Sequence, residues 1–125
     1  MPAFGYRFDT PDRSIVISGD TRPSDNLVRL ARDADVLVHD AVFPSAVDRL
    51  VGNVPNATRL KESILSHHTS AEDAGRIAQA AGVKVLVLSH LIPLEDPEVT
   101  EQMWLDAAGK HFSGRIVVGK DLLEI

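Results

Sequence analysis

The segment that decides the fold is Ser14-Ile15-Val16-Ile17-Ser18-Gly19-Asp20-Thr21, an apolar run that stops at Asp20. A second segment, Val83-Lys84-Val85-Leu86-Val87-Leu88-Ser89-His90, has the same form and stops at His90. Apolar runs this short are typical of strands buried on both faces, and polar residues at their carboxyl ends meet at one edge of a sheet. The sequence therefore predicts a site at that edge that includes Asp20 and His90.

Helix and strand patterns alternate around these two segments. The turn-like residues 10–13 predict an antiparallel hairpin between the strands on either side. Ser24 is a suitable cap for a short helix, and the apolar residues 36–38 predict another buried strand, which ends at His39 and Asp40. This alternation predicts an α/β fold.

The stretch from Phe43 to Ser66 is the hardest to assign. A helix is expected around residues 46–51, and Gly52-Asn53-Val54-Pro55-Asn56 then interrupts it with residues that favour turns. We predict a mobile excursion there and assign no further structure.

Stronger helix signals follow. Residues 69–73 form a capping pattern, and apolar residues then recur at helical spacing up to Gly82. A last helix is expected to begin after Asp96 as its cap and to end at Gly109. One or two short closing strands are expected over residues 115–118 and 122–123.

Composition limits the class of protein. The 125 residues predict one domain of ordinary globular composition, 44% hydrophobic and 25% charged. No apolar run approaches the roughly 20 residues that span a membrane, and the N-terminus lacks the pattern of an export signal, so we expect a cytoplasmic location and no membrane partner.

Because the chain has no cysteine, any metal must be held by His, Asp, Glu and water. A net charge of -5 argues against a broad basic surface for nucleic acid and leaves a local patch open.

Four motifs, in order and spacing, carry a resemblance to a known family. They are Ser18-Gly19-Asp20-Thr21, Val38-His39-Asp40-Ala41, His68-Thr69-Ser70-Ala71-Glu72-Asp73-Ala74 and Leu88-Ser89-His90. Together they resemble the C-terminal half of the metallo-β-lactamase fold, and within it the ribonuclease Z and arylsulfatase-like branch. The resemblance implies that residues 1–125 form an α/β half of the αββα sandwich, a mixed sheet of about five or six strands with helices packed on one face.

The resemblance also implies roles for individual residues. Asp20 matches the aspartate that bridges two metal ions, and His90 matches the histidine that completes the shell of the second ion; zinc is expected, with manganese as an alternative. His68 resembles the histidine that protonates the leaving oxygen in ribonuclease Z, and Asp40 stands where a carboxylate orients that histidine. The expected site is therefore a metal pair beside a proton-transfer pair.

Two departures from the family pattern affect this interpretation. The His-x-His-x-Asp-His motif of the N-terminal half, which supplies most metal ligands, is absent, because no histidine here is followed two residues later by another. Asp20 and His90 alone cannot fill two four-coordinate zinc shells, so this chain by itself is expected to be inactive and to bind a metal pair weakly or not at all. Asp40 also replaces a family glutamate, and Leu91-Ile92-Pro93 replaces a tail with Arg and Tyr, which favours another ester or phosphodiester over transfer RNA.

The sequence leaves two functions open. The first is a metal-dependent hydrolase of phosphodiesters or other small esters, active in a longer parent chain or with a complementing subunit. The second is a catalytically inactive truncated domain that acts as an oligomeric or interaction module. A half-sandwich is expected to expose an apolar sheet face, which formation of a homo-oligomer would cover.

The remaining histidines and two large apolar residues receive structural interpretations. His39 and His67 are expected to be structural or to support the site from outside the ligand shell, and His111 to interact with a helix terminus or with solvent. Met103 and Trp104 are expected in the core.

Overall fold

The computed structural model describes residues 2–52 and 54–125, so Asn53, one residue of the expected break, lies outside the described residues. The strands are β1 (Tyr6–Asp9), β2 (Ser14–Ile17), β3 (Val36–Val42), β4 (Val85–Ile92) and β5 (Arg115–Val118). The helices are α1 (Asp25–Leu30), α2 (Val47–Val51), α3 (Ala57–His67), α4 (Ala71–Ala81) and α5 (Glu101–Gly109), and a short 3-10 turn, η1 (Pro44–Ala46), precedes α2. None of these described helices has both the length and the apolar character needed to cross a bilayer.

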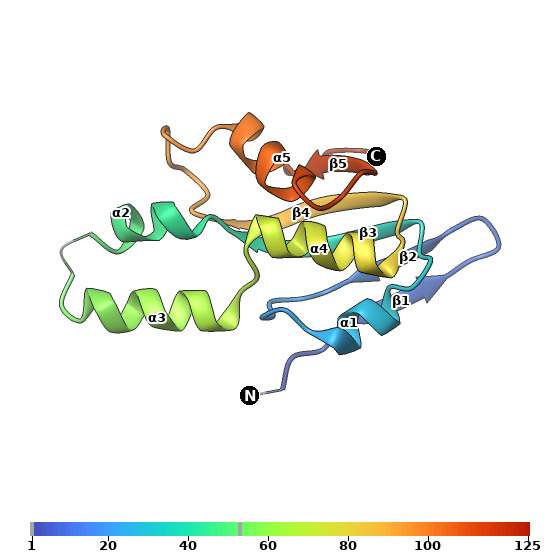
Figure 1. Ribbon diagram of the computed structural model, residues 1–125, viewed down its shortest axis with the longest axis horizontal. Helices are drawn as coiled ribbons and strands as arrows, with labels where there is room; N and C mark the ends of the chain where they lie inside the picture. Colours follow the sequence, from blue (N-terminus) through green and yellow to red (C-terminus); the bar gives the residue numbers. More distant parts are fainter. Residues whose placement is uncertain (1, 53) are drawn as a thin grey trace.

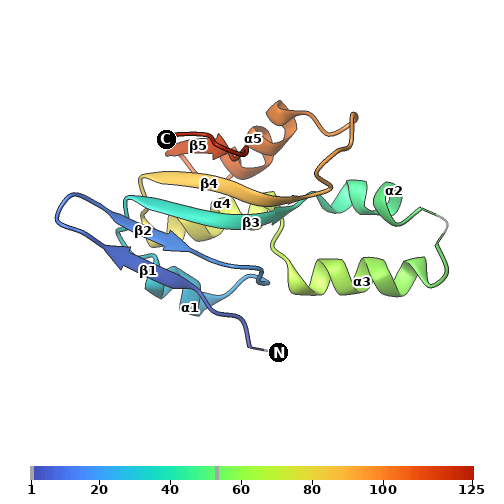
Figure 2. The ribbon, with the colours of Figure 1, turned by 180° about the vertical axis from the view of Figure 1, so that it is seen from behind.

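The five strands form one mixed sheet in the order β1-β2-β3-β4-β5. β1 and β2 are antiparallel and make the expected hairpin, whereas β2, β3, β4 and β5 are parallel neighbours. α1, α4 and α5 cover one face of the sheet, while the other face carries no helix in the described part of the chain (Figures 1 and 2). α2 and α3 extend beyond the end of the sheet. This arrangement confirms the predicted α/β fold with helices packed on one face of a mixed sheet.

The main core lies between the sheet and these helices. Leu37, Leu86 and Leu88 of the central strands are fully buried and pack in one cluster with small residues of α4. Gly75 of α4 allows α5 to approach closely, because a Cβ atom there would clash with the backbone of Ala108. Tight packing of this kind fixes the strands whose carboxyl ends carry the predicted site.

α5 supplies the aromatic part of that core. Trp104 is only 4% exposed, as predicted, and its ring packs edge-on against Phe43 at a centroid distance of 5.3 Å. Met103, which was also expected in the core, is only partly buried. The prediction therefore holds for the tryptophan and only in part for the methionine.

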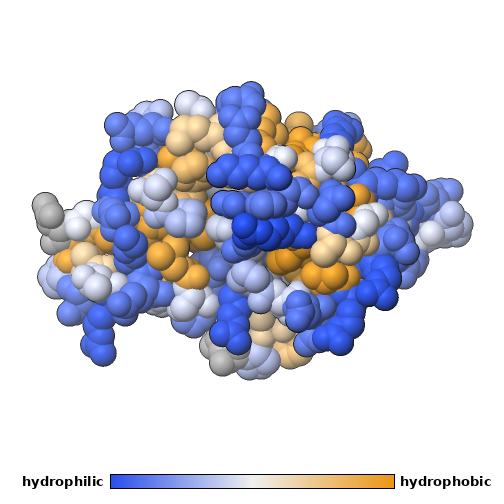
Figure 3. All heavy atoms as spheres, in the orientation of Figure 1, coloured by the Kyte–Doolittle hydropathy of each residue, from blue (hydrophilic) through white to orange (hydrophobic). Residues whose placement is uncertain are grey.

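The face of the sheet opposite the helices is apolar and partly exposed. Tyr6, Phe8 and Ile17 are 59%, 54% and 41% exposed. They lie on one face, because Tyr6 pairs with Ile17 while the neighbouring Val16 is buried on the other side. The helix-bearing face, in contrast, presents many hydrophilic side chains with smaller apolar patches between them (Figure 3). The expected exposed apolar sheet face is therefore present.

α4 follows the sequence prediction closely. Ser70 caps it by accepting a hydrogen bond from the backbone amide of Asp73 at 3.0 Å. The helix ends at Gly82, whose φ of 71° lies in the left-handed region that favours glycine. The helix therefore begins directly after the short segment His68-Thr69-Ser70.

The sequence does not predict α3, which occupies much of the stretch left without assigned structure. None of its residues is buried, although Leu60, Ile64 and Leu65 recur at helical spacing. Ile64 and Leu65 pack against Val47 and Val51 of α2 in a small cluster separate from the main core. The expected helix at residues 46–51 is thus present as α2, but the chain after its break returns to a helix.

The predicted start of the last helix is wrong, and one of the two stretches considered for closing strands forms a strand. α5 does not begin after Asp96, because Thr100 caps it by accepting a backbone hydrogen bond of 3.2 Å. Asp96 instead caps a separate turn, in which its Oδ1 accepts a backbone hydrogen bond of 2.9 Å. β5 confirms the strand at residues 115–118, whereas Leu122 and Leu123, both described, lie outside any strand.

Candidate metal centre

Residues from separate parts of the fold meet at one edge of the sheet. Asp20 follows β2 in the loop that leads to α1, and His90 lies near the end of β4. His68 follows α3 directly, and the connection from α3 to α4 pairs with the end of β3 through Val42 and Ser70. Because β2, β3 and β4 are parallel, their carboxyl ends and this connection share the same edge.

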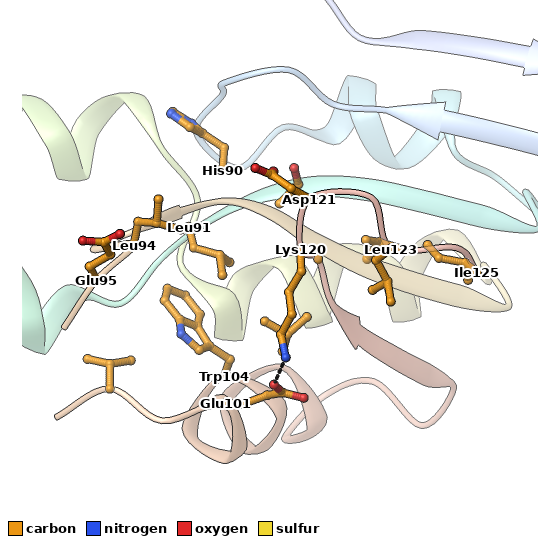
Figure 4. Close-up of a pocket in the computed structure, with 15 residues that line it drawn as sticks. His90, Leu91, Leu94, Glu95, Glu101, Trp104, Lys120, Asp121, Leu123 and Ile125 are labelled. Carbon is orange, nitrogen blue, oxygen red and sulfur yellow. Dashed lines mark ion pairs between the residues drawn. The ribbon is translucent and has the colours of Figure 1, made fainter. Parts of the chain in front are cut away.

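His90 lies at a bulge rather than at the end of its strand. The register between β3 and β4 passes from Asp40–Ser89 to Ala41–Leu91, so His90 is an extra residue in β4. Its φ of 45° is left-handed, which costs a non-glycine residue roughly 1–2 kcal/mol. Figure 4 shows the imidazole and the side chain of Leu91 pointing to opposite sides of the strand. The bulge therefore directs His90 toward the loop after β2.

Asp20, His68 and His90 form a cluster of metal-ligand atoms. Each offers one nitrogen or oxygen, and the three atoms all lie within 4.8 Å of one another. Nδ1 of His90 lies 2.8 Å from Oδ1 of Asp20. The ring centroids of His68 and His90 are 5.5 Å apart. Imidazole nitrogen and carboxylate oxygen are ligands that zinc accepts, so this donor set fits the expected metal.

His68 is held by Asp40 of β3. Asp40 is 3% exposed, and its Oδ2 lies 2.9 Å from Nδ1 of His68. An ionised carboxylate only accepts hydrogen bonds, so Nδ1 carries a proton and donates it in this pair. Nε2 is then the nitrogen of His68 that can take up a proton or bind a metal.

A second histidine contacts Asp40 from inside the fold. His39 is fully buried, and its Nδ1 lies 2.9 Å from both the carbonyl oxygen and Oδ1 of Asp40. Only the contact with the carbonyl oxygen has hydrogen-bond geometry, so Oδ1 of Asp40 and Nε2 of His39 have no hydrogen-bond partner among the described residues. His39 therefore lies outside the ligand cluster. It contacts Asp40, the residue that orients His68.

The other two histidines lie away from the cluster. Nδ1 of His67 is 2.7 Å from the carbonyl oxygen of Ser63 within α3. Nε2 of His111 is 2.9 Å from Oε1 of Glu72 in α4, and this hydrogen bond is the main cause of a lowered pKa of Glu72. His111 thus pairs with a specific carboxylate, which the sequence did not indicate.

Two buried hydroxyl groups at the site also escaped the sequence prediction. Ser18 is the last residue before the Gly19-Asp20 turn, and Thr69 lies between His68 and the cap of α4; both are at most 2% exposed. Ser18 bonds to the carbonyl oxygen of Gly19 and to the amide of Asp40 in β3, and Thr69 bonds to the carbonyl oxygen of Thr21. The one sequence signal was their position within the family-like motifs.

The surface beside the cluster is hollowed. A small hollow of about 110 Å³ lies directly at Asp20, Asp40 and His90. A larger hollow of about 700 Å³ extends from His90 along β4 and is lined mainly by apolar side chains (Figure 4). Lys120 and Glu101 form an ion pair of 2.8 Å in its wall. The candidate centre is therefore open to ligands from solution.

The chain is similar in sequence to curated ribonucleases Z. It is 40% identical over 121 residues to the putative ribonuclease Z of Mycobacterium tuberculosis (strain CDC 1551 / Oshkosh), and 36% identical over 121 residues to ribonuclease Z of Mycobacterium avium (strain 104). These alignments cover 97% of this chain but 51% and 41% of the two relatives, so the chain spans about half of their length or less. No protein-family model matches the chain.

Solved structures agree on the fold. The metallo-β-lactamase fold protein YhfI from Bacillus subtilis has a TM-score of 0.66 and 22% identity, over 91% of this chain and 40% of that chain. The short form of human tRNase Z has a TM-score of 0.59 and 23% identity, over 98% of this chain and 36% of that chain. At these identities the likeness establishes the fold and nothing further.

Proposed function

Because this chain belongs to the ribonuclease Z branch of the metallo-β-lactamase superfamily, we propose that it forms part of a metal-dependent nucleic-acid hydrolase. One observation carries the proposal, namely the convergence of ligand atoms from Asp20, His68 and His90 within 4.8 Å at the sheet edge. The relatives' names support a phosphodiester in RNA as the substrate, with another small ester as the alternative.

Asp20 and His90 are the residues that would hold the metal. Both side chains are more than half exposed, so an ion can reach them without unfolding of the sheet. Their oxygen and nitrogen donors suit zinc, and manganese is the second candidate. A bound zinc ion supplies Lewis acidity toward water and toward the phosphoryl oxygens of a substrate.

His68 and Asp40 are the residues that would move a proton. Asp40 accepts a hydrogen bond from Nδ1 of His68 and keeps the ring in one orientation. A proton on Nε2 can then pass to the leaving oxygen of a phosphodiester, which is general acid catalysis. A nitrogen that binds a metal cannot carry this proton, so the acid role requires that His68 is not a ligand during turnover.

The metal centre in this chain is incomplete as a site for two ions, because two four-coordinate shells need more ligands than these side chains provide. We therefore infer that residues 1–125 make up one half of the domain. The open sheet face with Tyr6, Phe8 and Ile17 is the surface on which a complementary half would pack.

The same face supports the alternative function, an interaction module without catalysis. Tyr6 and Phe8 are each more than half exposed, and apolar surface of this kind is stabilised when a second copy of the chain covers it. In that case the histidine–carboxylate pairs would have only a structural role.

Metal content tests the two functions on one sample. We expect the chain, purified without chelators, to retain a single zinc ion rather than a pair by plasma mass spectrometry, and Asp20→Ala to lose it. Asp12→Ala is the matched control, because this exposed aspartate lies in the turn between β1 and β2. Light scattering on the same sample gives the mass in solution. Zinc retained by Asp20→Ala would refute the metal assignment, and a metal-free oligomer would favour the interaction module.

A further inference from the structure

We propose that the buried hydroxyl groups of Ser18 and Thr69 are positioning groups for the carboxylate of Asp20. They donate hydrogen bonds to the two backbone carbonyl groups that flank it, those of Gly19 and Thr21. The inference rests on the proposed function in so far as Asp20 is a metal ligand. Neither hydroxyl touches the ligand atoms, so each acts through the loop.

Asp20 needs such support because its own side chain is loosely held. It lies in the loop between β2 and α1, its side chain is 58% exposed, and its ion-pair partner His90 is 54% exposed. Exposed ion pairs of this kind contribute little to order, because water competes for both charges. The order of the loop must therefore come from its backbone.

Thr69 holds the loop on the side of His68. Its side chain is fully buried, and its Oγ1 donates to the carbonyl oxygen of Thr21 at 2.6 Å. The Thr69 backbone is itself fixed, because the amide of Val42 in β3 donates to its carbonyl oxygen at 2.8 Å. One residue thus joins the end of β3, the residue after Asp20 and the segment that carries His68.

Ser18 holds the loop on the side of Asp40. It is 2% exposed, and its Oγ donates to the carbonyl oxygen of Gly19 at 2.6 Å. The same oxygen accepts a hydrogen bond from the amide of Asp40 at 3.2 Å, and the amide of Ser18 donates to the carbonyl oxygen of Val38 at 2.9 Å. Ser18 therefore sets the distance between the Asp20 loop and β3.

The two hydroxyls fix the loop from opposite ends and leave the carboxylate free to bind. Groups that orient a metal ligand in this way typically change metal affinity by about 10-fold to 100-fold when they are removed. Leaving a buried hydroxyl without a partner costs free energy, so both hydrogen bonds are expected to stay formed. The sequence positions of Ser18 and Thr69 within the site motifs then have a physical reason.

Thr69→Val tests the proposal, because valine keeps the shape of the side chain and removes the hydroxyl. Thr69→Ser restores the donor and is the rescue variant. Ser14→Ala is the matched control: its hydroxyl lies at the other end of β2 and contacts Asp35 at 3.1 and 3.3 Å, away from the site. Thermal unfolding of each variant confirms that the fold is retained.

The first readout is backbone order in the metal-free chain, from ¹⁵N relaxation at Asp20 and Thr21. We expect the order parameters to fall from about 0.85 to below about 0.6 in Thr69→Val, and to stay near the wild-type value in Thr69→Ser and Ser14→Ala. Unchanged order in Thr69→Val would overturn the proposal.

The second readout is the zinc dissociation constant, which we expect to rise about 10-fold to 100-fold in Thr69→Val and to recover in Thr69→Ser. An unchanged constant in Thr69→Val, where the wild type binds zinc through Asp20, would also overturn the inference. If the wild type bound no zinc through Asp20, the proposed metal role would fail, while the relaxation data would still decide whether Thr69 orders the loop.

Discussion

Two histidine–carboxylate pairs lie next to each other in the site and differ in burial. Nδ1 of His68 is 2.9 Å from Oδ2 of Asp40, and these side chains are 14% and 1% exposed. Nδ1 of His90 is 2.8 Å from Oδ1 of Asp20, but these side chains are 54% and 58% exposed. Packing holds the first pair, whereas water competes for the second, which can open to another ligand. The difference in burial supports the proposed proton-transfer role of the buried pair and the proposed metal-binding role of the exposed one.

Of the changes to these two pairs, His68→Ala should have the largest effect, and that effect should be on turnover. We expect turnover to fall by about 100-fold to 10,000-fold, because a general acid is lost, while metal content stays unchanged. The assay uses the assembly that is active, with the longer parent chain or a complementing subunit present. His67→Ala is the control, since this neighbouring ring bonds within α3. Equal turnover in His68→Ala and the control would rule out the acid role.

Changing Asp40 and Asp20 to asparagine, which keeps the shape of each side chain, shows how much each pair contributes to stability. Asp40→Asn is expected to lower the free energy of unfolding by about 1–3 kcal/mol, because a buried hydrogen-bonded partner of His68 is altered. Asp20→Asn is expected to change it by less than about 0.5 kcal/mol, because the pair is exposed. Urea unfolding measures both. Similar losses in the two variants would show that burial does not distinguish the pairs.

A third ion pair, between Asp35 and Lys84 outside the site, is expected to have the smallest effect, a change in how stability depends on pH. The hydrogen bond from Lys84, followed by that from the amide of Ser14, lowers the pKa of Asp35 from 3.8 to about 2. The folded state therefore favours ionised Asp35. This contribution to stability is present above pH 3.8 and is lost as the pH falls toward about 2.

Asp35→Asn should flatten the loss of stability in that pH interval, as measured by urea unfolding at a series of pH values. Glu72 and Asp96 also have lowered pKa values, so the wild type keeps some dependence on pH from them. The difference between wild type and variant isolates Asp35. Parallel curves would mean that the Lys84 pair does not stabilise the folded state.

Sequence reasoning predicted the elements whose signals are local or strongly periodic. The hairpin, the buried strands that lead to Asp20 and His90, and α4 with its Ser70 cap and Gly82 end follow from short-range rules. It also predicted that Asp40 and His68 belong together, through the resemblance of their motifs. The structure places their facing atoms 2.9 Å apart.

The remaining features depend on contacts that no local pattern encodes. α3 has no buried residue, and the turn-favouring residues 52–56 that precede it led the prediction away from the helical spacing of Leu60, Ile64 and Leu65. The β4 bulge arises from the pairing with β3, and sequence reasoning therefore ended the strand at His90 instead of continuing it to Ile92. The hydrogen bonds of Ser18 and Thr69 join segments far apart in sequence, and their partners become visible only in the folded chain.

The most direct test of the metal centre is ¹H–¹⁵N spectroscopy of the histidine ring nitrogens in this chain, with and without zinc. We expect zinc to change the ring signals of His90 and to leave those of His39, His67 and His111 unchanged, and we expect Asp20→Ala to remove the response. Zinc binding at His67 or His111, or a His90 signal that ignores zinc, would contradict the proposed metal centre.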